Sequence, residues 1–166
     1  MAETDPLEIF RTLERHGVRY LLIGAAAARI AGAPVVTEDI DVTPATDPKN
    51  LERLAAALRE LEARLRTASD PAGVHFVVEP ETLADANLWT LTMPAGDLDI
   101  CFVPAGTSGY DDLRREASRE SVGAGITVAV ASLRDVIRSK EAAGRPKDLA
   151  QLPLLRQTLE RIREHR

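Results

Sequence analysis

The chain has 166 residues, of which 45% are hydrophobic and 28% are charged, and its formal net charge is −5. This length predicts a single domain over residues 1–166, and the negative charge argues against a surface that coats nucleic acid broadly, while leaving room for a local basic patch. Cys101 is the single cysteine, so no intramolecular disulfide can form. A reducing, cytoplasmic location is expected, with no membrane partner, because the chain shows neither a signal-peptide pattern nor an apolar run long enough to span a bilayer.

The first half of the chain predicts helices that alternate with short strands. In chain order, these are a helix from Asp5-Pro6 to Gly17, a strand at 18–24, a short helix at 25–32, a strand at 38–42, a long helix at 47–65 and a strand at 74–78. Asp5-Pro6 is a typical helix start, because aspartate accepts free backbone amides and proline fits the first turn. Asp47-Pro48 repeats this signal, and leucines at helical spacing then predict one apolar stripe that ends with Leu65.

Hairpins and two helices are expected in the second half. The expected elements are a hairpin of strands 88–93 and 98–103 around a turn at 94–97, a short helix at 110–117, a second hairpin within 120–130, a helix at 132–143 and a last helix from 147 to the end, interrupted or started again near Pro153. Alternating apolar residues around Pro/Gly turns indicate the hairpins, and Ser132 and Gly144 cap the penultimate helix. Strands mixed with helices in this order predict an α+β domain.

Two pairs of aspartates stand in segments that otherwise resemble strands. Residues two apart on a strand share a face, so Asp39 and Asp41 in "EDIDV" lie together, opposite an apolar face. Asp97 and Asp99 in "GDLDICF" repeat the arrangement. Aspartate is depleted in strands, and like charges on one face repel unless something neutralises them. Carboxylates are hard ligands that suit Mg²⁺, so the pairs predict a site that holds divalent cations against a triphosphate.

Each aspartate motif also has a simpler interpretation. "EDIDV" fits a solvated edge strand whose charges discourage aggregation. Asp97 in "PAGD" fits ordinary turn chemistry, in which an aspartate closes the turn. The occurrence of both motifs in one chain, each beside an apolar face, favours the metal site over these two alternatives.

The segment before Glu38 supplies a candidate phosphate site. The apolar strand "VRYLLIG" ends at Gly24 and a short helix follows, which places free backbone amides and the positive end of a helix dipole together. The stretch from Gly24 to Val42 therefore predicts one unit, in which a phosphate cradle and a short helix precede the metal ligands.

A strand that ends in glycine, then "TEDIDV", then a later aspartate on a hairpin strand resemble the nucleotidyltransferase superfamily of DNA polymerase beta type. Within it, the chain is most similar to the small bacterial AbiEii/MNT-like nucleotidyltransferases, many of which are toxins of toxin–antitoxin pairs. The segment "VASLRDVIRSKEAAGRPKDLAQLPLL" also resembles that family, in which a helix carrying lysine precedes a basic stretch and an aspartate. The resemblance implies an α+β fold with a nucleotidyltransferase-like mixed β-sheet and helices packed on one face.

The resemblance implies roles for individual residues. Asp39 and Asp41 would be catalytic as the first two ligands of Mg²⁺ or Mn²⁺. Asp99 would be the third carboxylate ligand, preferred to Asp97 because it lies inside its strand, and would help to activate the acceptor hydroxyl. The residues implied to border or contact the nucleotide are Gly24, Ala25, Thr37, Lys140, Arg145, Lys147 and, in a supporting role, Asp148.

Ala25 departs from the family pattern, in which Gly-Gly or Gly-Ser usually stands where this chain has Gly24-Ala25. A second glycine would allow a positive φ and close backbone approach, and a serine would offer a hydroxyl to phosphate. We therefore expect a loop of somewhat different shape, with either weak activity or a nucleotide held mostly by metal and lysine.

By resemblance, the expected function is transfer of a nucleoside monophosphate from an NTP to a hydroxyl of RNA, such as a tRNA 3′ end, or of a protein, with release of pyrophosphate. A cognate antitoxin is then an expected partner. One alternative is modification of an aminoglycoside-like antibiotic, against which the short chain argues because no separate acceptor domain is visible. Another is a non-catalytic module that binds a nucleotide or a partner, which Ala25 favours and the intact aspartates oppose.

Overall fold

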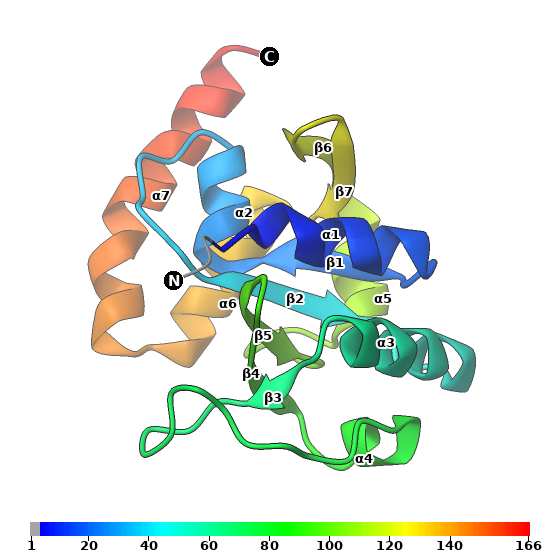
Figure 1. The fold of residues 1–166 in the computed structure, drawn as a ribbon. Helices are drawn as coiled ribbons and strands as arrows, with labels where there is room; N and C mark the ends of the chain where they lie inside the picture. The colour runs from blue at the N-terminus through cyan, green and yellow to red at the C-terminus, as the bar shows by residue number, and fades with distance from the viewer. Residues whose placement is uncertain (1–3) are drawn as a thin grey trace.

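The computed structural model describes residues 4–166 (Figure 1). Residues 1–3, which belong to the predicted domain and to the segment inspected for a signal peptide, lie outside the described part. The helices are α1 (Pro6–Arg15), α2 (Gly24–Ile30), α3 (Pro48–Glu60), α4 (Pro80–Ala84), α5 (Tyr110–Leu113), α6 (Leu133–Ala143) and α7 (Pro146–Glu164), with a 3-10 turn, η1 (Arg114–Glu116), after α5. The strands are β1 (Tyr20–Ile23), β2 (Ile40–Pro44), β3 (Arg64–Leu65), β4 (Leu88–Met93), β5 (Gly96–Cys101), β6 (Ser118–Gly123) and β7 (Ile126–Val130).

These strands form one mixed sheet in the order β3-β4-β5-β2-β1-β7-β6. Strand β1 runs antiparallel to β2 and parallel to β7, whereas β2 runs parallel to β5. The outer pairs β3–β4, β4–β5 and β6–β7 are antiparallel. This arrangement confirms the α+β class and the mixed sheet that the sequence predicts, and it places β2 between β1 and β5.

One face of the central strands is apolar. Leu22 of β1 lies opposite Val42 of β2, and both residues are buried. Helices α1 and α3 contact each other, and Figure 1 shows α1 in front of β1, with α3 further along in teal. Leu13 of α1 and Leu54 of α3 belong to the same hydrophobic core as Leu22 and Val42. Because side chains alternate along a strand, the residues next to Val42 face the opposite side of the sheet.

Helix α4 packs beside α3, and the other helices lie toward the opposite side of the sheet or at its edge. Helices α5 and α6 pass behind the sheet in Figure 1; α5 contacts β1, and α6 contacts α2 and α7. Helix α7 then runs along the outside of the molecule, in orange and red. In residues 4–166, no helix combines the length and the apolar composition that a bilayer crossing requires.

The long third helix ends earlier than its leucine stripe predicts. Helix α3 stops at Glu60, and Glu62 then adopts a positive φ of 58°, which breaks the helical path. Leu65 therefore lies in β3, opposite Leu91 of β4, instead of on the helix. The prediction was wrong at this end because an apolar residue at helical spacing can equally well pack from a strand.

The segment 74–78 is not a strand, contrary to the prediction. Within it, only Val74 pairs with a strand residue, in a single bridge to Leu65. Phe76 instead stacks on Trp89, with ring centroids 5.5 Å apart, and Val77 is exposed. Strand β3 already pairs with the side of β4 that faces away from β5, so the segment finds no long strand edge to extend.

The last helix is continuous through Pro153, where the sequence predicts an interruption or a new start. Helix α7 runs from Pro146 to Glu164 without a break. A proline inside a helix removes one backbone hydrogen bond, but Leu152 and Leu155 on either side are buried and hold this part of the helix against the core. Tertiary packing therefore overrides the local signal.

Candidate active site

Asp41 and Asp99 lie side by side on the sheet face opposite the α1–α3 layer. They are register partners in the parallel pair β2–β5, so their side chains leave the sheet in the same direction. Thr43, two residues further along β2, is fully buried, and its Oγ1 donates to the backbone carbonyl of Cys101 over 2.8 Å. This hydrogen bond fastens the two strands together beside the aspartates.

Burial and nearby negative charge both oppose ionisation of the pair. Burial, followed by the charges of Asp99 and Asp39, raises the pKa of Asp41 to about 6. The charge of Lys140 acts in the opposite direction. Burial also raises the pKa of Asp99, although the guanidinium of Arg66 opposes this. Adjacent, partly buried carboxylates that resist ionisation are typical of functional sites.

Gly24 lies against Asp41 at the end of β1. Its φ is +67°, and a Cβ at this position would lie 2.5 Å from Oδ2 of Asp41, so any other residue would be strained and would have to displace the carboxyl group. Helix α2 begins here, as the expected phosphate cradle requires. Ala25 follows inside the helix and does not have a positive φ. Ala25 therefore fits the helix without the positive φ that a glycine would allow, although it offers no hydroxyl.

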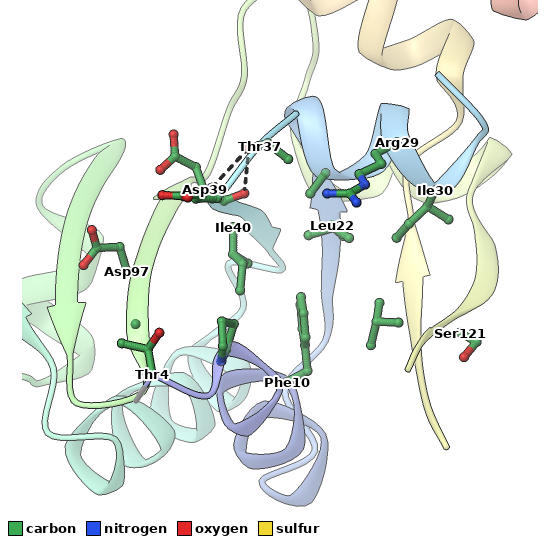
Figure 2. Close-up of a pocket in the computed structure, with 15 residues that line it drawn as sticks. Thr4, Phe10, Leu22, Arg29, Ile30, Thr37, Asp39, Ile40, Asp97 and Ser121 are labelled. Atoms are coloured by element: carbon green, nitrogen blue, oxygen red, sulfur yellow. Dashed lines mark hydrogen bonds between the residues drawn. The ribbon is translucent and has the colours of Figure 1, made fainter. Parts of the chain in front are cut away.

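Asp39 lies just before β2 rather than on it, because the strand begins at Ile40 and not at residue 38. Thr37 fixes this loop: its Oγ1 accepts from the Asp39 amide over 3.1 Å and donates to the Asp39 carbonyl over 3.4 Å (Figure 2). The exposed Asp39 is near enough for its charge to raise the pKa of both Asp41 and Asp99. Thr37, expected to contact the nucleotide, thus holds an acidic residue in place.

Asp148 gathers two of the expected phosphate-contacting cations near the start of α7. Nζ of Lys140 lies 3.5 Å from Oδ1 of Asp148, and Nε of Arg145 lies 2.7 Å from Oδ2. Burial, with 1% of the side chain exposed, pushes the pKa of Asp148 upward. The hydrogen bond and charge of Arg145 and the charge of Lys140 outweigh this effect and lower the pKa overall.

Both cations lie close enough to Asp41 to interact with its charge, so the cluster around Asp148 borders the carboxylate pair. Lys147 does not belong to this cluster. It is exposed on the first turn of α7, and among residues 4–166 no ion pair joins it to an acidic side chain. The structure therefore brings Lys140, Arg145 and Asp148 to the site and leaves Lys147 outside it.

Arg66, which sequence reasoning missed, binds both aspartates of "GDLD". Its NH2 group lies 2.9 Å from Oδ1 of Asp99, and its NH1 group lies 3.1 Å from Oδ2 of Asp97. NH1 also donates to the carbonyl of Leu91 over 3.0 Å. No motif surrounds this arginine, and its partner Asp99 is 33 residues away in the chain. The strand order brings Arg66 close to Asp99: Arg66 follows β3, which lies next to β4, and β4 lies next to β5.

Asp97 lies within β5, opposite Thr92 of β4, because the predicted turn at 94–97 is shorter than expected and the strand already begins at Gly96. Asp97 is exposed, and its carboxylate is a partner of Arg66. The interpretation that Asp97 only closes a turn is therefore wrong.

The oxygen donors of Asp41 and Asp99 suit Mg²⁺ or Mn²⁺, and the charge of Asp39 acts on both carboxylates. Burial raises the pKa of Asp41 most and the neighbouring charges of Asp99 and Asp39 add to it, and a divalent cation would compensate that negative charge. Within residues 4–166, however, no three acidic, histidine or cysteine side chains are already arranged as a metal-binding group. Side-chain movement must therefore precede binding by all three aspartates.

Known proteins resemble the chain in structure and not in sequence, since neither a protein-family model nor a curated protein matches it. The solution structure of ANT(2'')-Ia, described as an antibiotic-resistance factor, matches 92% of this chain and 81% of its own, with a TM-score of 0.58 and 16% identity. The crystal structure of ANT(2'')-Ia with adenylyl-2''-tobramycin gives a TM-score of 0.59 at 16% identity, over 92% and 86% of the two chains.

A third match is TM1012 from Thermotoga maritima, which is assigned as a nucleotidyltransferase. It has a TM-score of 0.52 and 16% identity, over 93% of this chain and 90% of that protein. The chain has the nucleotidyltransferase fold. The superfamily fold that "TEDIDV" predicts is confirmed, and at this low identity the likeness concerns the fold alone.

This nucleotidyltransferase fold contains a cavity of about 840 Å³ that adjoins the aspartates. Figure 2 shows Phe10, Leu22 and Ile30 pointing into it, with Asp39 and Asp97 along one side. Residues from α1, α2, β5 and the loop before β2 line it, whereas Asp41 and Asp99 do not. The cavity therefore has an apolar floor and an acidic rim, and it meets the carboxylate site at its rim.

Proposed function

We propose that the protein is a divalent-cation-dependent nucleotidyltransferase that moves a nucleoside monophosphate from an NTP to a hydroxyl of RNA or protein. The observation that carries the proposal is the pairing of Asp41 with Asp99 on one sheet face, against Gly24 and beside the start of α2. The fold shared with nucleotidyltransferases supports it.

In the proposed reaction, the acceptor oxygen bonds to the α-phosphorus while the bond to the departing pyrophosphate breaks. Asp99 would accept the proton of the acceptor hydroxyl, and Asp39 and Asp41 would complete the cation site. Bound Mg²⁺ or Mn²⁺ would supply the positive charge that the triphosphate and the pyrophosphate require. Lys140, held by Asp148, lies where its charge already acts on Asp41, so it would contact the phosphates from the α6 side.

RNA or protein is the proposed acceptor class, with a tRNA 3′ end as one candidate and a cognate antitoxin as the proposed partner. This part of the proposal rests on the resemblance of "TEDIDV" and of the segment from Val130 to Leu155 to AbiEii/MNT-like nucleotidyltransferases. The exposed Lys147 and Arg145 at the start of α7 would offer positive charge to an RNA backbone.

A second candidate is a small cationic acceptor of the aminoglycoside kind. The acidic residues Glu38, Asp39 and Asp97 along the cavity outnumber the lining cation Arg29, which favours an amine-bearing molecule. Chain length no longer argues against it, because this chain spans 81% and 86% of the two ANT(2'')-Ia chains. The non-catalytic alternative loses part of its support, since Ala25 adopts a helical conformation without a positive φ, but this residue still offers no hydroxyl to phosphate.

The deciding experiment is to incubate the purified protein, Mg²⁺ and each α-³²P-labelled NTP with a whole-cell lysate, followed by separate nuclease and protease digestion. We expect label in macromolecules, removed by nuclease for an RNA acceptor or by protease for a protein acceptor. A parallel reaction with tobramycin in place of lysate tests the second candidate. The absence of transfer with every NTP and acceptor, while Mg²⁺ and NTP still bind, would contradict the enzyme proposal.

A further inference from the structure

The guanidinium of Arg66 binds the carboxylate of Asp99, which the proposed reaction uses as a cation ligand and proton acceptor. Its contact with Asp99 is 2.9 Å long, and only 25% of each of the two side chains is exposed. The backbone on both sides of this contact is fixed, because the amide of Arg66 donates to the carbonyl of Thr90, the register partner of Asp99. Arg66 is therefore a built-in positive charge at the carboxylate pair.

Arg66 has a second anchor that does not involve the site. NH1 binds Oδ2 of Asp97 and the carbonyl of Leu91, whereas NH2 alone binds Asp99. The contact with Asp99 can break while the other two persist. The guanidinium then stays beside the site with one edge free, and a planar arginine edge binds phosphate oxygens well.

We propose that Arg66 is an internal counter-cation of Asp99 that gives way when a divalent cation binds there and then pairs with the triphosphate of the incoming nucleotide. The inference rests on the proposed function, because it takes Asp99 as a cation ligand. It explains why Asp39, Asp41 and Asp99 are near one another in residues 4–166 without forming a ready metal-binding group. It also assigns Asp97 the role of retaining Arg66, a positioning role without direct contact to the cation.

The two halves of the proposal predict effects of opposite sign for Arg66→Gln. Loss of a positive charge roughly 5 Å from a divalent cation should tighten binding of Mn²⁺ alone by about tenfold. Loss of an arginine–phosphate contact should weaken binding of the Mn²⁺–tripolyphosphate complex by about tenfold. Tripolyphosphate serves as the probe because it carries no base, so the identity of the NTP does not matter. A purely structural role would move both affinities in the same direction.

Electron paramagnetic resonance of free Mn²⁺ and calorimetry measure the two affinities in wild type, Arg66→Gln, Arg66→Lys and Asp97→Asn. Asp97→Asn keeps Arg66 but removes one of its anchors, so it should weaken binding of the Mn²⁺–tripolyphosphate complex without tightening binding of Mn²⁺ alone. Arg66→Lys should shift both affinities in the same directions as Arg66→Gln but less, because an ammonium lacks the forked geometry.

Weaker or unchanged binding of Mn²⁺ alone in Arg66→Gln would overturn the proposal, as would two shifts of the same sign. Failure of both Arg66 variants to fold would make Arg66 structural and overturn it too. If wild type transfers label from an NTP but Arg66→Gln does not shift the two affinities in opposite directions, the inference about Arg66 is wrong and the proposed function stands. The opposite shifts without any transfer leave the inference standing and contradict the proposed transfer. A wild type and an Arg66→Gln variant that both bind no Mn²⁺ contradict both.

Discussion

Gly24 and Asp41 lie so close together that a Cβ at residue 24 would meet Oδ2 of Asp41 at 2.5 Å. The carboxylate on β2 therefore occupies the space that a side chain at the end of β1 would fill. This fit makes the cost of a methyl group at Gly24 a direct measure of how firmly the Asp41 carboxyl is held.

Gly24→Ala should lower the free energy of unfolding by more than its positive φ alone explains. Gly17 is a matched control, since its φ is +69° and no atom lies within 4 Å of a Cβ placed there. We expect a loss of about 1 kcal/mol for Gly17→Ala and at least roughly twice that for Gly24→Ala. Urea denaturation of both variants provides the comparison, and equal losses would show that the Asp41 carboxyl moves aside freely.

Asp41→Asn should stabilise the metal-free protein at neutral pH. The folded pKa of about 6 lies above the unfolded value near 4, so the folded state binds the proton more tightly and wild type loses stability as the pH rises between these values. One pKa unit corresponds to about 1.4 kcal/mol, or roughly 3–6 °C in melting temperature for a protein of this size. We expect a gain of at least that size at neutral pH.

The same gain should vanish near pH 4, where the Asp41 carboxyl of folded wild type is protonated and resembles the amide. Thermal melts of both proteins across this pH range measure the effect. The exposed Asp39 provides the control, since Asp39→Asn should change the melting temperature less. A gain for Asp41→Asn that is the same at both ends of the range would contradict the assigned pKa shift.

Asp148→Asn should destabilise the protein and release the two cations that the carboxylate holds. The lowered pKa of Asp148 means that its contribution is present above the unfolded value near 4 and is lost as the pH falls through the lower folded value. We expect a loss of about 1–3 kcal/mol at neutral pH. Arg156→Gln, which breaks the exposed 2.7 Å pair with Glu141, is the control and should change stability by less than about 1 kcal/mol.

Divalent cations should raise the melting temperature of wild type, and an NTP should increase the rise, because ligands that bind only the folded state stabilise it. The double variant Asp39→Asn with Asp41→Asn should lose this response while remaining folded. Differential scanning fluorimetry with Mg²⁺ and Mn²⁺, with and without NTP, provides the measurement. A response of equal size in wild type and double variant would exclude these carboxylates as the cation ligands.

The sequence predicts the parts of the site that depend on local patterns. Gly24 and the alternation around Asp41 and Asp99 can be recognised because each stands at a strand end or inside a strand with a clear apolar face. Their convergence also follows if the two strands are neighbours, which the superfamily fold implies. Thr37 and Asp39 were harder to place, because where β2 begins depends on pairing with β1 and β5.

Arg66 could not be predicted, because its importance comes from the order of strands in space. A two-residue strand such as β3 leaves no periodic pattern, and the leucine stripe of α3 runs past its true end into Leu65. The strand predicted at 74–78 does not form for a related reason, because the edge of β4 that it would need pairs with β3. Local sequence describes each element well but says little about which edge remains free.

The hydrogen bond from Thr43 to the carbonyl of Cys101 joins residues 58 positions apart. During synthesis, β1, β2 and α3 emerge well before β5, so β2 at first has an open edge on the side away from β1. An unpaired strand edge invites pairing with other chains, and charged side chains oppose it. Asp39 and Asp41 therefore oppose edge pairing of β2 before the sheet is complete. A chain that stops before β5 has these two carboxylates but lacks Asp99.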